Sequence, residues 1–301
     1  MTTLAINCEL RCDRLMQRQP GALVLKRVYD FVPPAAEEAW TVEAVETIKT
    51  GTLFCVFRAQ IIRPAGAALD VVLKIDPTGE CEAACKNEQR VYREAKNLQG
   101  SALPYFYGCF QVQIGAAMVT CLAIEHCGEP LQKNFHELDY AFAGKLLRSV
   151  AALHAYGSTH GDLYPRNVRV LGDTPILIDF ESSEPHTCGM RMMTVPGTTR
   201  PTAEEYGCVE LYNLVFRMGL WKPGNLKFNG KLLEKESVQT VEDIKRWIPE
   251  ECDPDYRELL EEKADIAFEQ LCAERILTWG TDQFSERKTR LDIYKPAAPS
   301  A

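Results

Sequence analysis

The stretch HGDLYPRN (residues 160–167) and the triplet DFE (residues 179–181) are the most informative segments of this sequence of 301 residues. Between them, two short apolar runs, 168–171 and 176–178, flank the turn GDTP at 172–175. This pattern predicts a β-hairpin, because Gly and Asp favour tight turns between strands. A hairpin closed at Gly172-Asp173 brings Asn167, before its first strand, beside Asp179, after its second.

The two side chains that this hairpin brings together suit a hard cation. An amide oxygen and a carboxylate are ligands that Mg²⁺ takes in proteins, and phosphates complete its shell. Asp162 lies five residues before Asn167, on the loop that enters the same place. We expect it to orient a hydroxyl group and to accept its proton. The alternative is a polar turn in which these residues only cap the backbone, but their combined spacing favours the site.

Two further charges stand in apolar surroundings. Lys74 lies in the strand-like run LDVVLKI (residues 69–75), and Glu88 falls on the apolar stripe of the helical pattern at 81–99. An unpaired buried charge is costly, so the pattern predicts that each neutralises the other. The alternative is that both side chains reach solvent separately.

The rest of the chain divides into a strand-rich part and a helix-rich part. Alternating patterns predict strands within 42–76 and 109–125, and helical spacing predicts helices at 138–153 and from 204 onward. We expect four segments, namely an N-terminal extension of no assigned structure (1–40), a first lobe (41–126), a second lobe (127–290) and a tail (291–301). The length agrees with two lobes at about 150 residues each.

Composition excludes several classes of protein. With 46% hydrophobic residues the chain has enough apolar side chains to fold, and its net charge of −8 argues against a nucleic-acid binder with a basic surface. The longest apolar run, 114–124, is too short to span a membrane, and from the residues at the start of the sequence we expect no secretory signal. Twelve cysteines without a CxxC pair indicate reduced thiols rather than zinc. We therefore expect an intracellular, cytoplasmic protein.

Taken together, these motifs resemble those of the protein-kinase-like superfamily, over roughly residues 42–220. VVLK (71–74) resembles the lysine strand of kinases, and Glu88 the glutamate that pairs with that lysine. LAIEHCG (122–128) resembles the hinge, HGDLYPRN the catalytic loop, and DFE the metal-binding DFG. The resemblance implies an α+β, two-lobed protein-kinase-like fold, with an antiparallel sheet and one helix in the first lobe and a mainly helical second lobe.

The resemblance also implies roles for individual residues. ATP and Mg²⁺ are the implied cofactors, with the metal held by Asn167 and Asp179. The implied catalytic residues are Asp162, Lys74, Glu88 and Arg166. The implied nucleotide-binding residues are Gly51, Val56, Val72, Lys74, Glu125 and Cys127.

The sequence departs from the kinase pattern at three places. Only Gly51 and Val56 remain of the glycine-rich loop, Gly161 stands where kinases of the HRD form have arginine, and Glu181 replaces the DFG glycine. The HGD and DFE forms resemble aminoglycoside and choline kinases and divergent fungal protein-kinase-like chains. In contrast, GTTRPTAEE (197–205) resembles the GT…APE segment of protein kinases.

Three functions remain open from the sequence. The first is transfer of the ATP γ-phosphate to a protein Ser or Thr hydroxyl. The second is a small-molecule kinase of the aminoglycoside or choline class, and the third is a nucleotide-binding pseudokinase scaffold. We expect a protein or small-molecule hydroxyl acceptor and neither a nucleic acid nor a membrane as partner. The identity of the acceptor and the oligomeric state are left open.

Overall fold

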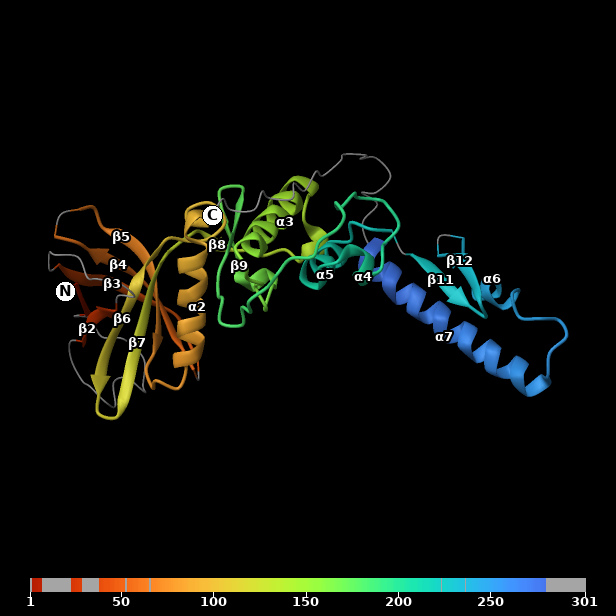
Figure 1. Ribbon diagram of the computed structural model, residues 1–301, viewed down its shortest axis with the longest axis horizontal. Coiled ribbons are helices and arrows are strands. Elements are labelled where there is room, and N and C mark those ends of the chain that lie inside the picture. Colours follow the sequence, from red (N-terminus) through yellow and green to blue (C-terminus); the bar gives the residue numbers. More distant parts are fainter. Residues whose placement is uncertain are drawn as a thin grey trace. The chain divides into compact units, whose positions relative to one another are not determined.

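The computed structural model describes residues 2–6, 23–28, 38–51, 53–64, 66–222, 224–235 and 237–279 (Figure 1). The chain forms two compact units. The first unit comprises the described residues up to 131 together with 152–187, and the second comprises 132–151 and the described residues from 188 onward.

The first unit is built on a closed β-barrel of seven strands. The strands are β1 (Thr3–Ile6), β2 (Leu23–Val28), β3 (Ala39–Thr50), β4 (Cys55–Ile62), β5 (Leu69–Asp76), β6 (Phe106–Ile114) and β7 (Ala117–Glu125). Their order around the barrel is β1-β2-β6-β7-β5-β4-β3. All neighbours are antiparallel except β1 and β3, whose parallel pairing of Thr3 with Ala39 through Ile6 with Val42 closes the barrel.

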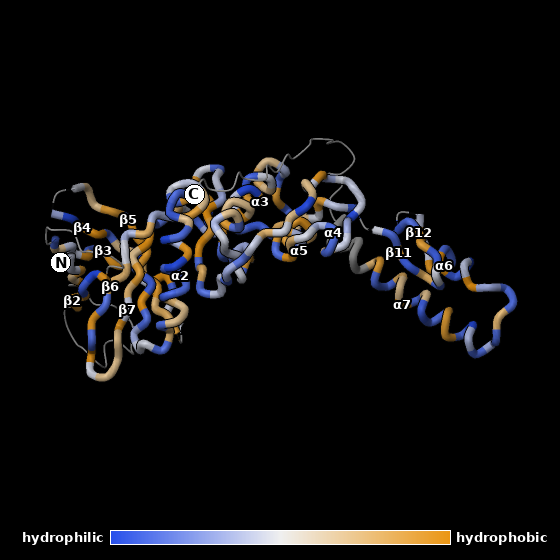
Figure 2. The backbone as a smooth tube through the Cα atoms, in the orientation of Figure 1, coloured by the Kyte–Doolittle hydropathy of each residue, from blue (hydrophilic) through white to orange (hydrophobic). Residues whose placement is uncertain are grey.

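Alternation of apolar and polar residues explains these strands. In β4, Phe57, Ala59 and Ile61 are buried, whereas Gln60 between them is exposed. Successive side chains of a strand point to opposite faces, so one face of each strand fills the interior. Figure 2 shows hydrophobic and hydrophilic residues changing along the strands in this way. The interior is a single apolar cluster that includes Leu4 and Leu25 from the first two strands.

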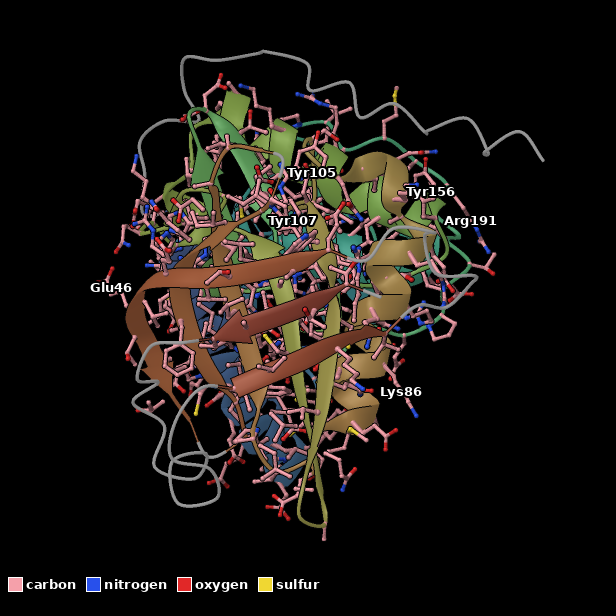
Figure 3. The ribbon with its side chains drawn as sticks, turned by 90° about the vertical axis from the view of Figure 1, so that its left-hand side faces the viewer. Glu46, Lys86, Tyr105, Tyr107, Tyr156 and Arg191 are labelled. Atoms are coloured by element: carbon pink, nitrogen blue, oxygen red, sulfur yellow. The ribbon has the colours of Figure 1, made fainter. Side chains whose placement is uncertain are left out.

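One helix, α2 (Glu82–Glu94), accompanies the barrel, and a short 3₁₀ turn (Lys96–Leu98) follows it. The carboxylate of Asp76 fixes the entry to α2, because it accepts hydrogen bonds from the backbone N–H groups of Thr78, Gly79 and Cys81 at 2.9 Å each. Glu88 and Tyr92 lie on the buried face of α2, whereas Lys86 points into solvent (Figure 3). The apolar stripe predicted for this helix is confirmed.

The predicted hairpin is confirmed as β9 (Val168–Leu171) and β10 (Thr174–Leu177), paired antiparallel around Gly172 and Asp173. A third short strand, β8 (Glu129–Pro130), pairs with β9. A 3₁₀ turn (Pro165–Asn167) directly precedes β9. The hairpin therefore places residues 167 and 179 at the same end, as the turn chemistry predicted.

The second unit combines helices with a two-stranded sheet. Its elements are η2 (Phe135–Glu137), most of α3 (Tyr140–Ala155), α4 (Ala203–Tyr206), α5 (Val209–Arg217), β11 (Asn225–Phe228), β12 (Lys231–Glu234), α6 (Glu242–Lys245) and α7 (Pro254–Trp279). A separate apolar core joins the β11–β12 hairpin to α6 and α7. None of the helices in the described ranges combines the length and hydropathy that crossing a membrane requires.

The predicted fold class is wrong. The first part of the chain is a closed barrel with one parallel strand pair, not an open antiparallel kinase-like sheet. The described residues hold six α-helices, of which α4 and α6 have only four residues each, so the second part is not a mainly helical lobe. The error arose within residues 1–40, because β1 and β2 come from the segment to which no structure was assigned.

Adjacent residues of β2 test the barrel core. Leu25 is fully buried, whereas Val24 is half exposed. We expect Leu25→Ala to lower the free energy of unfolding by about 2–5 kcal/mol, because it removes buried methyl groups and leaves a cavity. Val24→Ala, the matched control, should change it by less than about 1 kcal/mol. Equal losses in urea denaturation would contradict the placement of β2 in the barrel wall.

Candidate functional site

A cavity of about 500 Å³ lies in the first unit and contains the most strongly interacting charges described there. Its walls come from the turn after β3, from β4 and β5, from the end of β7, and from the segments on either side of the β9–β10 hairpin. Small-molecule sites in proteins have volumes of about 300–1,000 Å³. The cavity is therefore large enough for a nucleotide-sized ligand.

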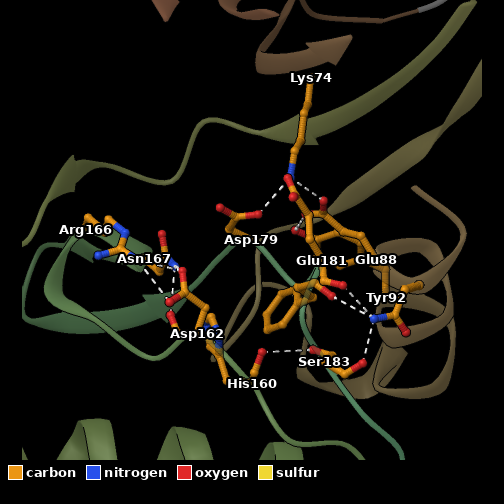
Figure 4. A network of polar contacts seen from close by, with 12 residues as sticks. Lys74, Glu88, Tyr92, His160, Asp162, Arg166, Asn167, Asp179, Glu181 and Ser183 are labelled. Carbon is orange, nitrogen blue, oxygen red and sulfur yellow. Dashed lines mark hydrogen bonds and ion pairs between the residues drawn. The ribbon is translucent and has the colours of Figure 1, made fainter. Parts of the chain in front are cut away.

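Lys74, on β5, is at the centre of the polar end of the cavity (Figure 4). Its Nζ lies 2.7 Å from a carboxylate oxygen of Glu88 on α2 and 2.8 Å from one of Asp179. It also forms an ion pair with Glu181. The predicted pairing of Lys74 with Glu88 is confirmed, and both residues are buried, with exposed fractions of 8% and 1%.

The charges around Lys74 keep it protonated. Burial acts to lower the pKa of the ammonium, but the nearby carboxylates of Glu88, Asp179 and Glu181 outweigh it and the pKa is raised. Burial acts against ionisation of Asp179 as well, yet Lys74 holds the pKa of that carboxyl below its usual value. The pKa of Glu181 is raised instead, because the effect of burial is larger than the lowering effect of the Lys74 charge.

The position of Asp179 depends on its backbone. It has a φ of +69°, a conformation that is uncommon for a residue with a side chain. Backbone strain of this kind costs about 1–3 kcal/mol and occurs most often at functional sites. The next residue, Phe180, is fully buried. Its ring packs edge-on against the ring of Tyr92 on α2, with the two ring centroids 5.4 Å apart, and at a tilt against the ring of His160, with centroids 5.1 Å apart.

The loop 160–167 brings a second set of polar groups to the cavity. The side-chain nitrogen of Asn167 donates to the backbone oxygen of Asp162 at 2.8 Å and to its carboxylate at 2.9 Å. Arg166 donates to both carboxylate oxygens of Asp162, at 3.0 and 2.8 Å. The backbone oxygen of Asn167 accepts from Ile178, the residue before Asp179, at 3.1 Å. The loop is thereby attached to the segment that carries Asp179.

Gly161 makes this loop possible. Its φ is +80°, and a Cβ atom at this position would lie 1.9 Å from the backbone oxygen of Ser182. No residue other than glycine fits without moving one of the two segments. The glycine of the HGD sequence, which departs from the HRD form, is therefore required by the close approach of 161 to 182.

All six residues predicted for nucleotide binding line the same cavity. Val56 on β4 pairs with Lys74 of β5 in the barrel wall, and Val72 is two residues before that lysine. The cavity is also lined by Gly51, Glu125 and Cys127. Burial raises the pKa of the Cys127 thiol to about 12, so this cysteine stays protonated and is a poor nucleophile.

All eleven predicted site residues can therefore be located in the structure. Ten of them line the cavity, namely Gly51, Val56, Val72, Lys74, Glu88, Glu125, Cys127, Arg166, Asn167 and Asp179. Asp162 is not part of the lining itself, but it is hydrogen-bonded to Arg166 and Asn167, which are.

Glu181 and Asn87 contribute to the site but were not predicted from the sequence. Glu181 was interpreted only as the loss of a flexible glycine, but its carboxylate joins those of Glu88 and Asp179, with oxygen atoms within 4.8 Å of one another. Asn87 received no role. Its side-chain nitrogen donates to the backbone oxygens of Glu181 at 2.9 Å and Ser183 at 2.6 Å, and its oxygen accepts from Arg90 at 3.0 Å. The only sequence signal for a role of Asn87 was its polar side chain directly before Glu88.

The donors at this end of the cavity fit a hard divalent cation. Asp179 and Glu181 supply carboxylate oxygens, and Asn167 an amide oxygen, while its nitrogen is engaged with Asp162. Oxygen ligands of this kind suit Mg²⁺ rather than softer metals.

Comparison with known proteins gives no relative from which to assign a function. No family model matches the chain, and no curated protein matches it. The chemistry of the cavity must therefore be inferred from its own residues, because function depends on the site and not on the fold.

Two glycines with similar backbones test the contact at Gly161. Gly172 also has a positive φ, +63°, but nothing lies within 4 Å of the position of its Cβ. We expect Gly172→Ala to cost about 1–2 kcal/mol through backbone strain alone. Gly161→Ala should cost at least about twice as much, because strain and collision add. Urea denaturation measures both, and equal losses would contradict the close approach of 161 and 182.

Neighbouring residues of α2 test the link to the segment 180–183. Asn87→Ala removes the donor to two carbonyl groups and should lower the free energy of unfolding by about 1–3 kcal/mol. Lys86→Ala, the control, removes only an exposed ion pair with Glu82 and should cost less. If both variants unfold at the same urea concentration, Asn87 does not hold this segment.

Proposed function

We propose that the cavity binds ATP with Mg²⁺ and that the protein transfers the γ-phosphate to a hydroxyl group. The observation that carries this proposal is the cluster around Lys74. One buried ammonium faces three carboxylates, those of Glu88, Asp179 and Glu181. When these are ionised, the cluster has an excess of two negative charges, which a divalent cation would neutralise.

The two ends of the cavity suit the two ends of a nucleotide. Val56, Val72 and Ile124 provide apolar surface for a base, and the backbone of 125–127 provides polar groups at its edge. Lys74, paired with Asp179 and Glu181, belongs to the polar part of the lining, where an ammonium group suits phosphate oxygens. When phosphates enter, Lys74 exchanges Asp179 and Glu181 for them and keeps Glu88 as its fixed partner.

Asn167 and Asp179 would hold Mg²⁺, with Glu181 as a further carboxylate. The metal supplies neutralisation of the charge on the phosphate oxygens. Asp179 is suited to this role because its pKa is lowered, so that it is ionised at neutral pH. Its strained backbone directs the carboxylate toward Lys74 and the cavity.

Asp162 would orient the acceptor hydroxyl and accept its proton. Its side chain is one third exposed and is held in place by Asn167. Arg166 lies beside it and can contribute positive charge to the transferred group. Catalysis would therefore come from positioning and electrostatic stabilisation, without a covalent intermediate on the protein.

The acceptor that we propose is a Ser or Thr hydroxyl of a protein. Tyr164 and Arg166, which follow Asp162 by two and four residues, are exposed, with exposed fractions of 47% for Tyr164 and 63% for the Arg166 side chain. An acceptor presented on another protein's surface can reach such a loop. The GTTRPTAEE segment adds no support, because Glu205 accepts from the backbone N–H of Thr202 at 2.7 Å and so caps α4.

The test is phosphate transfer from radiolabelled ATP with Mg²⁺, offered a generic protein and a mixture of hydroxylated small molecules. We expect label on protein. The value of kcat/KM should fall by at least about a hundredfold in Asp179→Ala and in Lys74→Met. Lys86→Ala, outside the cavity, is the control and should retain activity.

Three other outcomes have separate meanings. Label on small molecules alone would indicate the small-molecule kinase instead. Thermal stabilisation by Mg²⁺·ATP without any transfer would indicate a nucleotide-binding scaffold. Wild-type transfer by Asp179→Ala would contradict the metal assignment.

A further inference from the structure

Arg169 is a charged residue of the cavity that the proposed function does not use. It lies on β9, two residues after Asn167 of the preceding 3₁₀ turn, and both residues line the cavity. Ile178 follows β10 and belongs to the same lining. The hairpin therefore presents Asn167, Arg169 and Ile178 to one cavity.

Arg169 is near the end of the cavity that is formed by the 125–128 segment. In the register of β8 and β9, Pro130 pairs with Arg169 and Glu129 with Val170. A Cβ at Gly128 would lie 2.2 Å from the backbone oxygen of Val170, so this segment packs directly on β9. The positive charge of Arg169 also acts on the Cys127 thiol. These contacts place Arg169 beside the 125–128 segment, toward the proposed base end of the cavity.

No ion pair or side-chain hydrogen bond of Arg169 occurs within the described residues. Other arginines of the first unit differ in this respect: Arg58 pairs with Asp70, Arg90 with Glu94 and Arg166 with Asp162. Arg169 is also partly buried. A partly buried guanidinium without a protein partner is suited to contact a ligand.

We propose that Arg169 stacks its guanidinium on the face of the nucleobase and thereby selects nucleotides with a large aromatic base. The inference rests on the proposed function. Val56 and Val72 come from the barrel, and Arg169 and Ile178 from the hairpin, so a planar base fits between an aliphatic wall and a wall that contains a cation.

The chemistry of arginine supports this role. Its guanidinium is planar, weakly hydrated and always charged, and it stacks on aromatic rings. A cation over a π-system is favourable by roughly 0.5–2 kcal/mol, which corresponds to about 2–30-fold in affinity. Arg169 is a specificity-determining residue in this account, because a purine offers it more aromatic surface than a pyrimidine.

Calorimetric titration of the full chain with ATP, GTP, CTP and inorganic tripolyphosphate, all with Mg²⁺, tests this role. We expect Arg169→Leu to weaken ATP binding about 3–30-fold and CTP binding less, while tripolyphosphate affinity stays within about twofold. Arg169→Gln should change these affinities in the same way, and it replaces Arg169→Leu in the titration if that variant does not fold. Arg191→Leu, the same change at an exposed arginine, is the control.

The other results overturn the inference in distinct ways. An equal loss of tripolyphosphate affinity would assign Arg169 to the phosphates. If Arg169→Leu weakens GTP binding by a factor more than tenfold greater than it weakens ATP binding, Arg169 forms hydrogen bonds to the guanine edge instead of stacking. Unchanged ATP affinity in both variants would remove Arg169 from the site. If the unmodified protein binds neither ATP nor tripolyphosphate, the proposed function itself fails, and this inference with it.

Discussion

A buried lysine shared among three carboxylates is the interaction on which the site depends. Lys74 comes from the barrel wall, Glu88 from the helix beside it, and Asp179 and Glu181 from the segment after the hairpin. Electrostatic interactions are stronger where water is excluded, so the cluster couples three separate elements. Removing Lys74 would leave the buried carboxylate of Glu88 without a counter-charge, at a cost of about 3–5 kcal/mol. The same charges are also the groups that suit phosphates and a divalent cation.

The surrounding structure fixes this cluster at both sides. Asp76 holds the entry to α2, and Asn87 on that helix holds the segment after Asp179 by its backbone oxygens. Tyr92, Phe180 and His160 pack together beneath the carboxylates. The polar groups are therefore attached to rigid elements, as preorganised sites require.

The sequence predicts local features of this structure well and long-range closure poorly. Gly172 and Asp173 specify their hairpin, and the apolar context of Lys74 and Glu88 indicates their pairing, because each signal lies within a few residues. The parallel pairing of β1 with β3 has no such local signal, since it joins segments more than thirty residues apart. This is why the barrel was not predicted. Asn87 and Glu181 were missed because their partners are backbone groups or side chains distant in the sequence.

The most direct measurement of the central claim is a crystal structure of the full chain with Mn²⁺, in place of Mg²⁺, and a non-hydrolysable ATP analogue. The account predicts an anomalous peak bound by Asp179 and Asn167, with Lys74 still paired to Glu88 and moved from Asp179 to the phosphates. A nucleotide and metal bound elsewhere on the chain, or a Lys74 that still pairs with Asp179 beside a bound nucleotide, would contradict it.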